Sequence, residues 1–160
     1  TMDDEIDINL LIHKSIDLML PHLKKKTSRL VVETGNDLPV ISGNFQKLQQ
    51  VVINLLANAA EALENTEQSI TVTTTRDLKP GFVTIQVCDT DPGLNEKDLK
   101  NITEPFFTTR RDDGGTGLGL SISEKIVSSH KGIIEFESTP GKGLTATVCL
   151  PYTSDMETLR

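Results

Sequence analysis

The chain has 160 residues, with 23 acidic and 16 basic side chains and a formal net charge of −7. This length fits one domain, and the acidic balance disfavours broad contact with nucleic-acid phosphates or an anionic membrane surface. No apolar stretch approaches the roughly 20 residues of a membrane span, and no signal-peptide pattern begins the chain. We therefore expect one soluble domain (1–160), with a lead-in helix in 1–27, a core over about 28–151 and a polar tail in 152–160.

The first half of the chain predicts two helices and two short strands. Apolar residues recur at helical spacing over 8–24, and Pro21 is expected to kink or end that helix. LVVET and LPVIS are typical of strands, separated by GND. A long helical pattern then covers 44–65, with Asn44 as its expected N-cap.

The second half predicts two strand pairs with a helix between them. ITVTTTR and FVTIQVCD indicate a hairpin across LKPG, and GIIEFES with TATVCLP indicate a second pair across TPGKG. The intervening chain is a loop-rich region over 90–116, followed by the helical pattern LGLSISEKIVSSH. This order predicts an α+β fold with a mixed sheet covered by helices on one face.

The cysteines and histidines favour structural roles. Cys88 and Cys149 lie in β-branched stretches without CxxC spacing, so we expect buried, reduced strand cysteines and a reducing, cytosolic setting. His13, His22 and His130 fall in three different segments, which gives no basis for a histidine zinc site.

An asparagine pair lies beside the apolar stripe of the second helix. Asn54 and Asn58 are one turn apart, about 40° around the helix at roughly 100° per residue. Such a polar face is usually only solvated. However, asparagine is a poor residue for an exposed helix interior. Its amide oxygen is also a neutral ligand for Mg²⁺, an ion that takes its other ligands from water and substrate phosphates. The pattern leaves both interpretations open.

An aspartate ends the strand FVTIQVCD. Asp89 shares a face with Val83, Ile85 and Val87 by the period-two rule. One interpretation is a turn-starting aspartate, and the other is an acceptor for a ligand amine at the bottom of a pocket. Spacing alone does not choose between them.

The third candidate is the long stretch ITEPFFTTRRDDGGTGLGL. A connection of this length is usually a lid or disordered, and Phe106 and Phe107 could pin one end of it. Its glycines lead into a helix, where unpaired N–H groups and the helix dipole favour a phosphate. GTGLGL does not follow an apolar strand, so a dinucleotide-binding fold is disfavoured.

The order of these segments resembles a known family. VINLLANAAEA, DTDPG, EPFFTTR, GGTGLGL and TPGKGLTATVCLP are similar to the N, G1, F, G2 and final glycine boxes of sensor histidine kinase ATP-binding domains. That family belongs with the topoisomerase, mismatch-repair and heat-shock chaperone ATPases. The resemblance implies a two-layer α/β sandwich with a largely antiparallel mixed sheet, the Bergerat-type ATP-binding fold.

The resemblance also implies roles for individual residues. Asp89 would bind the adenine amino group, Gly93 would shape the ring pocket, and Asn58 would coordinate Mg²⁺. Asn54 would lie beside the phosphates, as the second catalytic residue with Asn58. The region 106–115 would form a lid, expected to be mobile without nucleotide. The full ATP-binding set would be Asn54, Asn58, Asp89, Gly93, Thr109, Gly115, Thr116, Gly117, Leu118 and Gly119.

Some positions depart from the family pattern. Asp91 stands where the family has the first glycine of its G1 box, and Glu61 stands where many relatives have a basic residue. Neither HKSID nor HLKKK supplies the phosphoacceptor box, a histidine followed by an acidic residue. His130 resembles a structural position at a helix end. The chain therefore looks like a catalytic half separated from its acceptor domain.

The resemblance predicts an ATP:protein-histidine kinase of a two-component system. Its partners would be its own dimerisation and phosphoacceptor domain and a response regulator, with no nucleic acid and no direct membrane contact. The setting would be cytoplasmic, although the parent protein could be membrane-anchored. The alternatives are a nucleotide-sensing module without catalysis and a hydrolysing ATPase. Hydrolysing relatives carry a glutamate where this chain has Asn54, which disfavours the ATPase.

Overall fold

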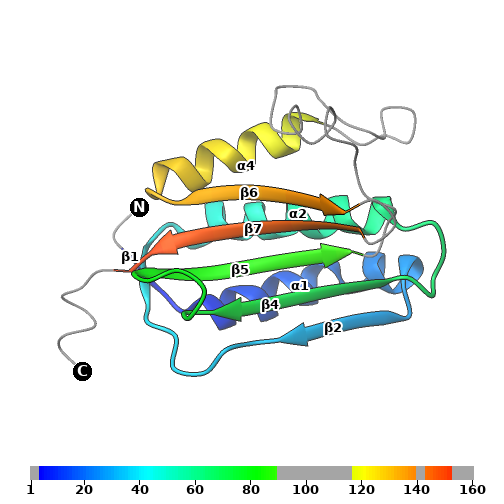
Figure 1. Ribbon diagram of the computed structural model, residues 1–160, viewed down its shortest axis with the longest axis horizontal. Helices are drawn as coiled ribbons and strands as arrows, with labels where there is room; N and C mark the ends of the chain where they lie inside the picture. Colours follow the sequence, from blue (N-terminus) through cyan, green and yellow to red (C-terminus); the bar gives the residue numbers. More distant parts are fainter. Residues whose placement is uncertain (1–3, 90–116, 140–142, 153–160) are drawn as a thin grey trace.

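The fold is a sheet with helices packed on one of its faces (Figure 1). The computed structural model describes residues 4–89, 117–139 and 143–152. Within these ranges the helices are α1 (Ile8–Lys26), α2 (Phe45–Ala62) and α4 (Gly117–Ser129). The strands are β1 (Asp4–Ile6), β2 (Arg29–Glu33), β3 (Ile41–Gly43), β4 (Ser69–Thr75), β5 (Phe82–Asp89), β6 (Ile133–Thr139) and β7 (Gly143–Pro151). The expected α+β class is confirmed.

The main sheet is mixed and largely antiparallel, as expected. Its strand order is β2-β4-β5-β7-β6, and only the β2–β4 pair is parallel. A parallel pair needs a crossover connection, and here the crossover contains β3 and α2. The strand order therefore brings α2 across the face of the sheet.

Helix α2 begins at the expected cap and buries the expected stripe. The side chain of Asn44 accepts a hydrogen bond from Lys47 N at 2.9 Å, which satisfies one of the free N–H groups at the helix start. The predicted stripe residues Leu48, Val52, Leu55, Ala59 and Ala62 are each at most 5% exposed. Their burial leaves the polar side of α2 at the edge of the packed layer.

Helix α1 lies within the range 1–27 expected for the lead-in helix and continues past Pro21. Asp7 caps its start by accepting from Leu10 N, and the helix continues through Pro21 to Lys26. Of the two outcomes expected at Pro21, a kink or an end of the helix, the end is wrong. Proline removes one backbone hydrogen bond, but Leu23 is only 1% exposed and anchors the last turn by packing in the core.

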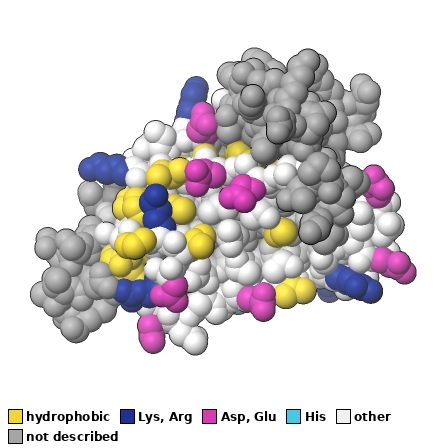
Figure 2. Space-filling model, viewed as in Figure 1, with side chains coloured by type: hydrophobic (Ala, Val, Ile, Leu, Met, Phe, Trp, Pro, Cys, Tyr) yellow, Lys and Arg dark blue, Asp and Glu magenta, His cyan; other side chains and the backbone are white. Residues whose placement is uncertain are grey.

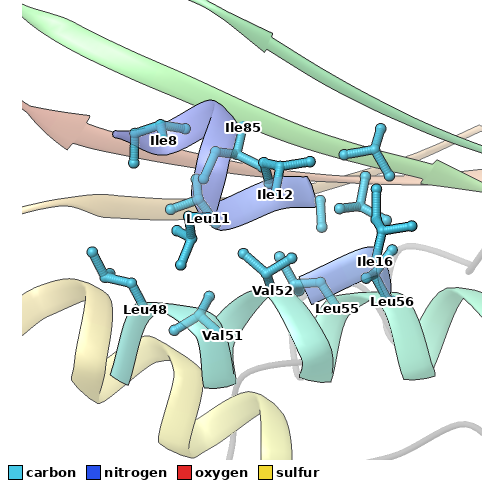
Figure 3. Close-up of a cluster of buried hydrophobic side chains, with 14 of the residues drawn as sticks. Ile8, Leu11, Ile12, Ile16, Leu48, Val51, Val52, Leu55, Leu56 and Ile85 are labelled. Carbon is cyan, nitrogen blue, oxygen red and sulfur yellow. The ribbon is translucent and has the colours of Figure 1, made fainter. Parts of the chain in front are cut away.

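The core lies between the two long helices and the sheet. Figure 3 shows labelled side chains of α1 and α2 directed into one apolar layer, with Ile85 of β5 beside them. Every labelled residue is at most 7% exposed. None of the helices in the described ranges is long and apolar enough to cross a lipid bilayer.

The opposite face of the sheet is polar. Thr73 donates to Gln86 Oε1 at 3.5 Å, and Gln86 Nε2 donates to Thr147 Oγ1 at 3.2 Å, which joins three strands in one row. Figure 2 shows acidic and basic side chains scattered over this side of the molecule. Both cysteines are free, as expected, but only Cys149 is buried, and Cys88 is half-buried. The strand register puts both on this face, with Cys149 opposite Thr84 and Cys88 opposite Thr145.

A small second sheet was not expected from the sequence. β1 pairs with β3 in antiparallel register, with Ile6 opposite Ile41. Of the predicted strand LPVIS (38–42), only Ile41 and Ser42 belong to β3, which ends at Gly43. The sequence gives only a weak signal for these two strands, because each has three residues, and a period-two pattern cannot be recognised over so short a stretch.

His130 joins the end of α4 to the start of α2. Its Nε2 accepts from Asn44 N at 3.0 Å, and its Nδ1 lies 2.8 Å from Ile126 O, so Nδ1 is the protonated donor. Gly43 makes this approach possible, because a Cβ there would lie 2.5 Å from His130 Cδ2. His130 is 6% exposed, which supports the expected structural role.

Replacing His130 by alanine should lower the free energy of unfolding by about 2–4 kcal/mol, because it leaves a cavity and unpaired backbone groups. Urea unfolding followed by circular dichroism would measure the loss. His13→Ala is the matched control, since His13 is exposed and its removal should change stability by less than about 0.5 kcal/mol. Equal effects of the two substitutions would contradict the role of His130.

Candidate functional site

Three of the segments singled out by sequence meet at one end of the sheet. Figure 1 shows that the carboxyl end of β5, the second half of α2 and the start of α4 lie at the same end of the molecule. The helices α2 and α4 run in opposite directions, because Asn44 contacts His130 while Asn54 contacts Gly119. The sheet order and this helix pair therefore bring residues more than 60 positions apart into one region.

Asp89 is a buried carboxylate at the end of the central strand β5. It is 2% exposed and shares the helix-covered face with Val83, Ile85 and Val87, which are each at most 3% exposed. Leu144 N on β7 lies 3.5 Å from its Oδ1, a long hydrogen bond. The expected face of Asp89 is confirmed. A carboxylate at this depth needs hydrogen-bond donors, because desolvation of its charge is costly.

Asn54 joins α2 to α4. Its side-chain nitrogen Nδ2 donates to the carbonyl oxygen of Gly119 and to Oγ of Ser123, both at 3.2 Å. Ser123 is fully buried, and Gly119 lies in the first turn of α4. The asparagine is therefore part of a helix contact and does not lie on a merely solvated face.

Asn58 follows one turn later on α2 and is half-buried. Its amide can supply one neutral oxygen ligand. In the described ranges no group of three or more His, Cys, Asp or Glu residues could hold a metal ion. A single amide oxygen suits Mg²⁺, which keeps several waters and takes further ligands from substrate phosphates. The donor chemistry at Asn58 thus fits a Mg²⁺ ion that is delivered with a phosphate ligand.

The structure describes only part of the expected site. Gly117, Leu118 and Gly119 lie in the first turn of α4, as expected from the glycine-rich pattern. Gly93, Thr109, Gly115 and Thr116 lie outside the described residues, as do Asp91 and the lid expected over 106–115. For these residues the roles remain predictions.

Sequence reasoning missed two residues of this region. Ser123 was not singled out, because a serine within an amphipathic helix gives no signal until its partner on another helix is known. Leu144 contributes only its backbone N–H, and its approach to Asp89 depends on the β5–β7 register. The register pairs Cys88 with Thr145, which places Leu144 next to the end of β5.

Comparison with known proteins defines the family. The family described as "Histidine kinase-, DNA gyrase B-, and HSP90-like ATPase" matches residues 43–154. The chain belongs to this family. The matched range contains the expected sequence boxes from the asparagine pair to the last strand.

Curated relatives include sensor kinases from several bacteria. Sensor histidine kinase ZraS of Klebsiella oxytoca is 36% identical over 146 residues, which is 91% of this chain and 31% of ZraS. Sporulation kinase E of Bacillus subtilis is 33% identical over 159 residues, which is 99% of this chain and 21% of the relative. The chain thus spans less than a third of the length of either protein.

Solved structures share the fold. The nucleotide-free catalytic domain of histidine kinase ThkA superposes with a TM-score of 0.80 at 32% identity, covering 96% of this chain and 97% of that domain. Full-length ShkA in complex with AMPPNP gives 0.80 at 25% identity, covering 94% of this chain and 31% of ShkA. Histidine kinase ThkA in complex with response regulator TrrA superposes with a TM-score of 0.77 at 28% identity. The match covers 95% of this chain and 42% of the ThkA chain.

Proposed function

We propose that this chain binds ATP with Mg²⁺ and transfers the γ-phosphoryl group to a histidine of a dimerisation domain outside the chain. The observation that carries the proposal is the buried carboxylate of Asp89 at the end of β5. The family and the kinase relatives support an ATP-binding domain of a two-component sensor kinase.

Asp89 is suited to recognise an exocyclic amine such as that of adenine. Both of its oxygens are acceptors. It is the last residue of β5, whose carboxyl end lies at the same end of the molecule as the start of α4 (Figure 1). A hydrogen bond from an amine to an ionised carboxylate is stronger than one between neutral groups. The apolar side chains of β5 on the same face would exclude water from this contact.

The phosphates would lie at the start of α4. The N–H groups of a first helical turn lack partners inside the helix, and the helix dipole favours negative charge there. Asn58 would hold Mg²⁺ by its amide oxygen, and the ion would supply neutralisation of the phosphate charge. Positioning and charge neutralisation are the main protein contributions to phosphoryl transfer.

The partners of the whole protein are part of the proposal. ThkA was solved with a response regulator, and the same kind of partner is proposed for the parent of this chain. The acceptor histidine would be on the parent's dimerisation domain, because His130 is buried and bonded at both ring nitrogens. We also propose that the chain is a single domain with its core over about 28–151, and that this domain lies in the cytoplasm.

The alternative function, hydrolysis of ATP by water, is disfavoured by the residue at position 54. A general base must accept a proton from water, and Asn54 carries a neutral amide whose nitrogen is bonded to α4. The geometry therefore supports transfer to an external acceptor better than activation of water.

Asp89→Asn should weaken ATP binding by about 10- to 100-fold, because a hydrogen bond to a charged group contributes about 1.5–3 kcal/mol. Isothermal titration calorimetry with ATP and Mg²⁺ would measure the change. Asp77→Asn is the matched control, since Asp77 is exposed in the β4–β5 turn at the far end of the hairpin. ATP binding that is indifferent to Asp89→Asn would contradict the nucleotide site.

The isolated chain should release phosphate from ATP far more slowly than the roughly 10 s⁻¹ of a median enzyme. Adding the parent's dimerisation domain should yield a phosphohistidine, detected with radiolabelled ATP. Labelling should disappear with EDTA or Asn58→Ala. Rapid phosphate release that Asn54→Ala abolishes would indicate an ATPase, whereas ATP binding without labelling would indicate a sensing module.

A further inference from the structure

The side-chain amide of Asn54 has one possible orientation. Gly119 O lies 3.2 Å from it and is a carbonyl, which can only accept a hydrogen bond. The atom facing Gly119 must therefore be the nitrogen, and the assignment does not depend on the usual ambiguity between amide oxygen and nitrogen. The second hydrogen of the same NH₂ group is donated to Ser123 Oγ.

This orientation limits what Asn54 can offer a ligand. An asparagine NH₂ has two hydrogens, and here both are used on α4. The remaining oxygen Oδ1 accepts hydrogen bonds and donates none. While these contacts hold, Asn54 has no donor for a phosphate oxygen.

Ser123 is placed to complete the contact. It is fully buried and lies on the apolar side of α4, because it is three residues after Leu120 and four before Val127. An apolar residue would be expected at this position. Its hydroxyl lies one helical turn from Gly119, so that one NH₂ group spans both. The serine is therefore explained by its partner on α2.

The two ends of α4 are held to α2 by different contacts. His130 bonds the last turn to Asn44 N, while Asn54 bonds the first turns through Gly119 and Ser123. Only the second contact is at the end of α4 where the proposed phosphate site begins. Loss of the Asn54 contact should therefore loosen the start of α4 and leave its end in place.

We propose that Asn54 is a positioning residue that, together with Ser123, holds the first turns of α4 in the orientation in which their N–H groups meet the phosphates. This inference rests on the proposed function for the identity of the ligand. Asn54 would then affect nucleotide binding through its hold on α4, whereas Asn58 would hold the metal ion directly. Ser123 becomes part of the binding apparatus through Asn54.

The test compares two variants that break the contact from opposite sides. Asn54→Asp keeps the size and an acceptor oxygen but has no donors, and Ser123→Ala removes one of the two acceptors. Ser15→Ala is the matched control, because Ser15 is also fully buried but donates to Leu11 O within α1. Two measurements are made at pH 7.5: amide hydrogen exchange without nucleotide, and calorimetric titration with ATP and Mg²⁺.

We expect exchange to accelerate by about tenfold or more in the first half of α4 in Asn54→Asp, and by a smaller factor in Ser123→Ala. Exchange at the His130 amide should be unchanged in both. ATP affinity should fall in the same order, while Ser15→Ala binds like the wild type. If Asn54→Asp folds poorly, Ser123→Ala alone decides by the same two measurements.

Unchanged exchange in the first half of α4 together with wild-type ATP affinity in both variants would overturn the inference. Tighter binding of ATP and Mg²⁺ by Asn54→Asp would also overturn it, since that result would indicate a direct metal contact by residue 54. Wild-type protein that binds no ATP would instead contradict the proposed function. The exchange measurement would still decide whether Asn54 and Ser123 hold α4.

Discussion

Burial of one face of α2 is the constraint on which the site depends. Leu48, Val52 and Leu55 must face α1 and the sheet, and this requirement fixes the rotation of the helix about its axis. Asn54 is then directed toward α4, where it donates to Gly119 O, and Asn58 follows one turn later, about 40° around the helix. The apolar stripe thus positions two polar side chains that the core itself does not need. A helix whose polar face were only solvated would have no such consequence, because its side chains would lack fixed partners.

Asp89 is positioned by the same kind of constraint in the sheet. The period-two alternation of β5 puts every second residue against the helices, and the last residue of that series is the carboxylate. A register shift by one residue would turn Asp89 to the polar face with Gln86 and expose it. Pairing with β4 on one side and β7 on the other prevents this shift, and β7 also supplies Leu144 N. The function proposed for Asp89 is therefore a consequence of strand register in the centre of the sheet.

Sequence reasoning predicted what local patterns determine. The stripe and cap of α2, the hairpin of β4 and β5, and the face of Asp89 all follow from periodicity and turn residues, and all are confirmed. The parallel β2–β4 pairing and the β1–β3 ladder depend on long-range contacts that leave no periodic signal. Pro21 does not end α1, because packing of Leu23 in the core outweighs the local preference of proline. Ser123 could not be found, since its role exists only when Asn54 is beside it.

The central claim is that a nucleotide binds where β5 ends and α4 begins. Two-dimensional NMR of the ¹⁵N-labelled chain, titrated with AMPPNP and Mg²⁺, tests it most directly. We expect saturable shifts at the backbone amides of Asp89, Leu144, Asn58 and Gly119, and at the Asn58 side-chain amide. We expect no shifts on the polar face at Thr73, Gln86 and Thr147. Shifts confined to that polar face, or no saturable shifts at all, would contradict a nucleotide site between β5 and α4.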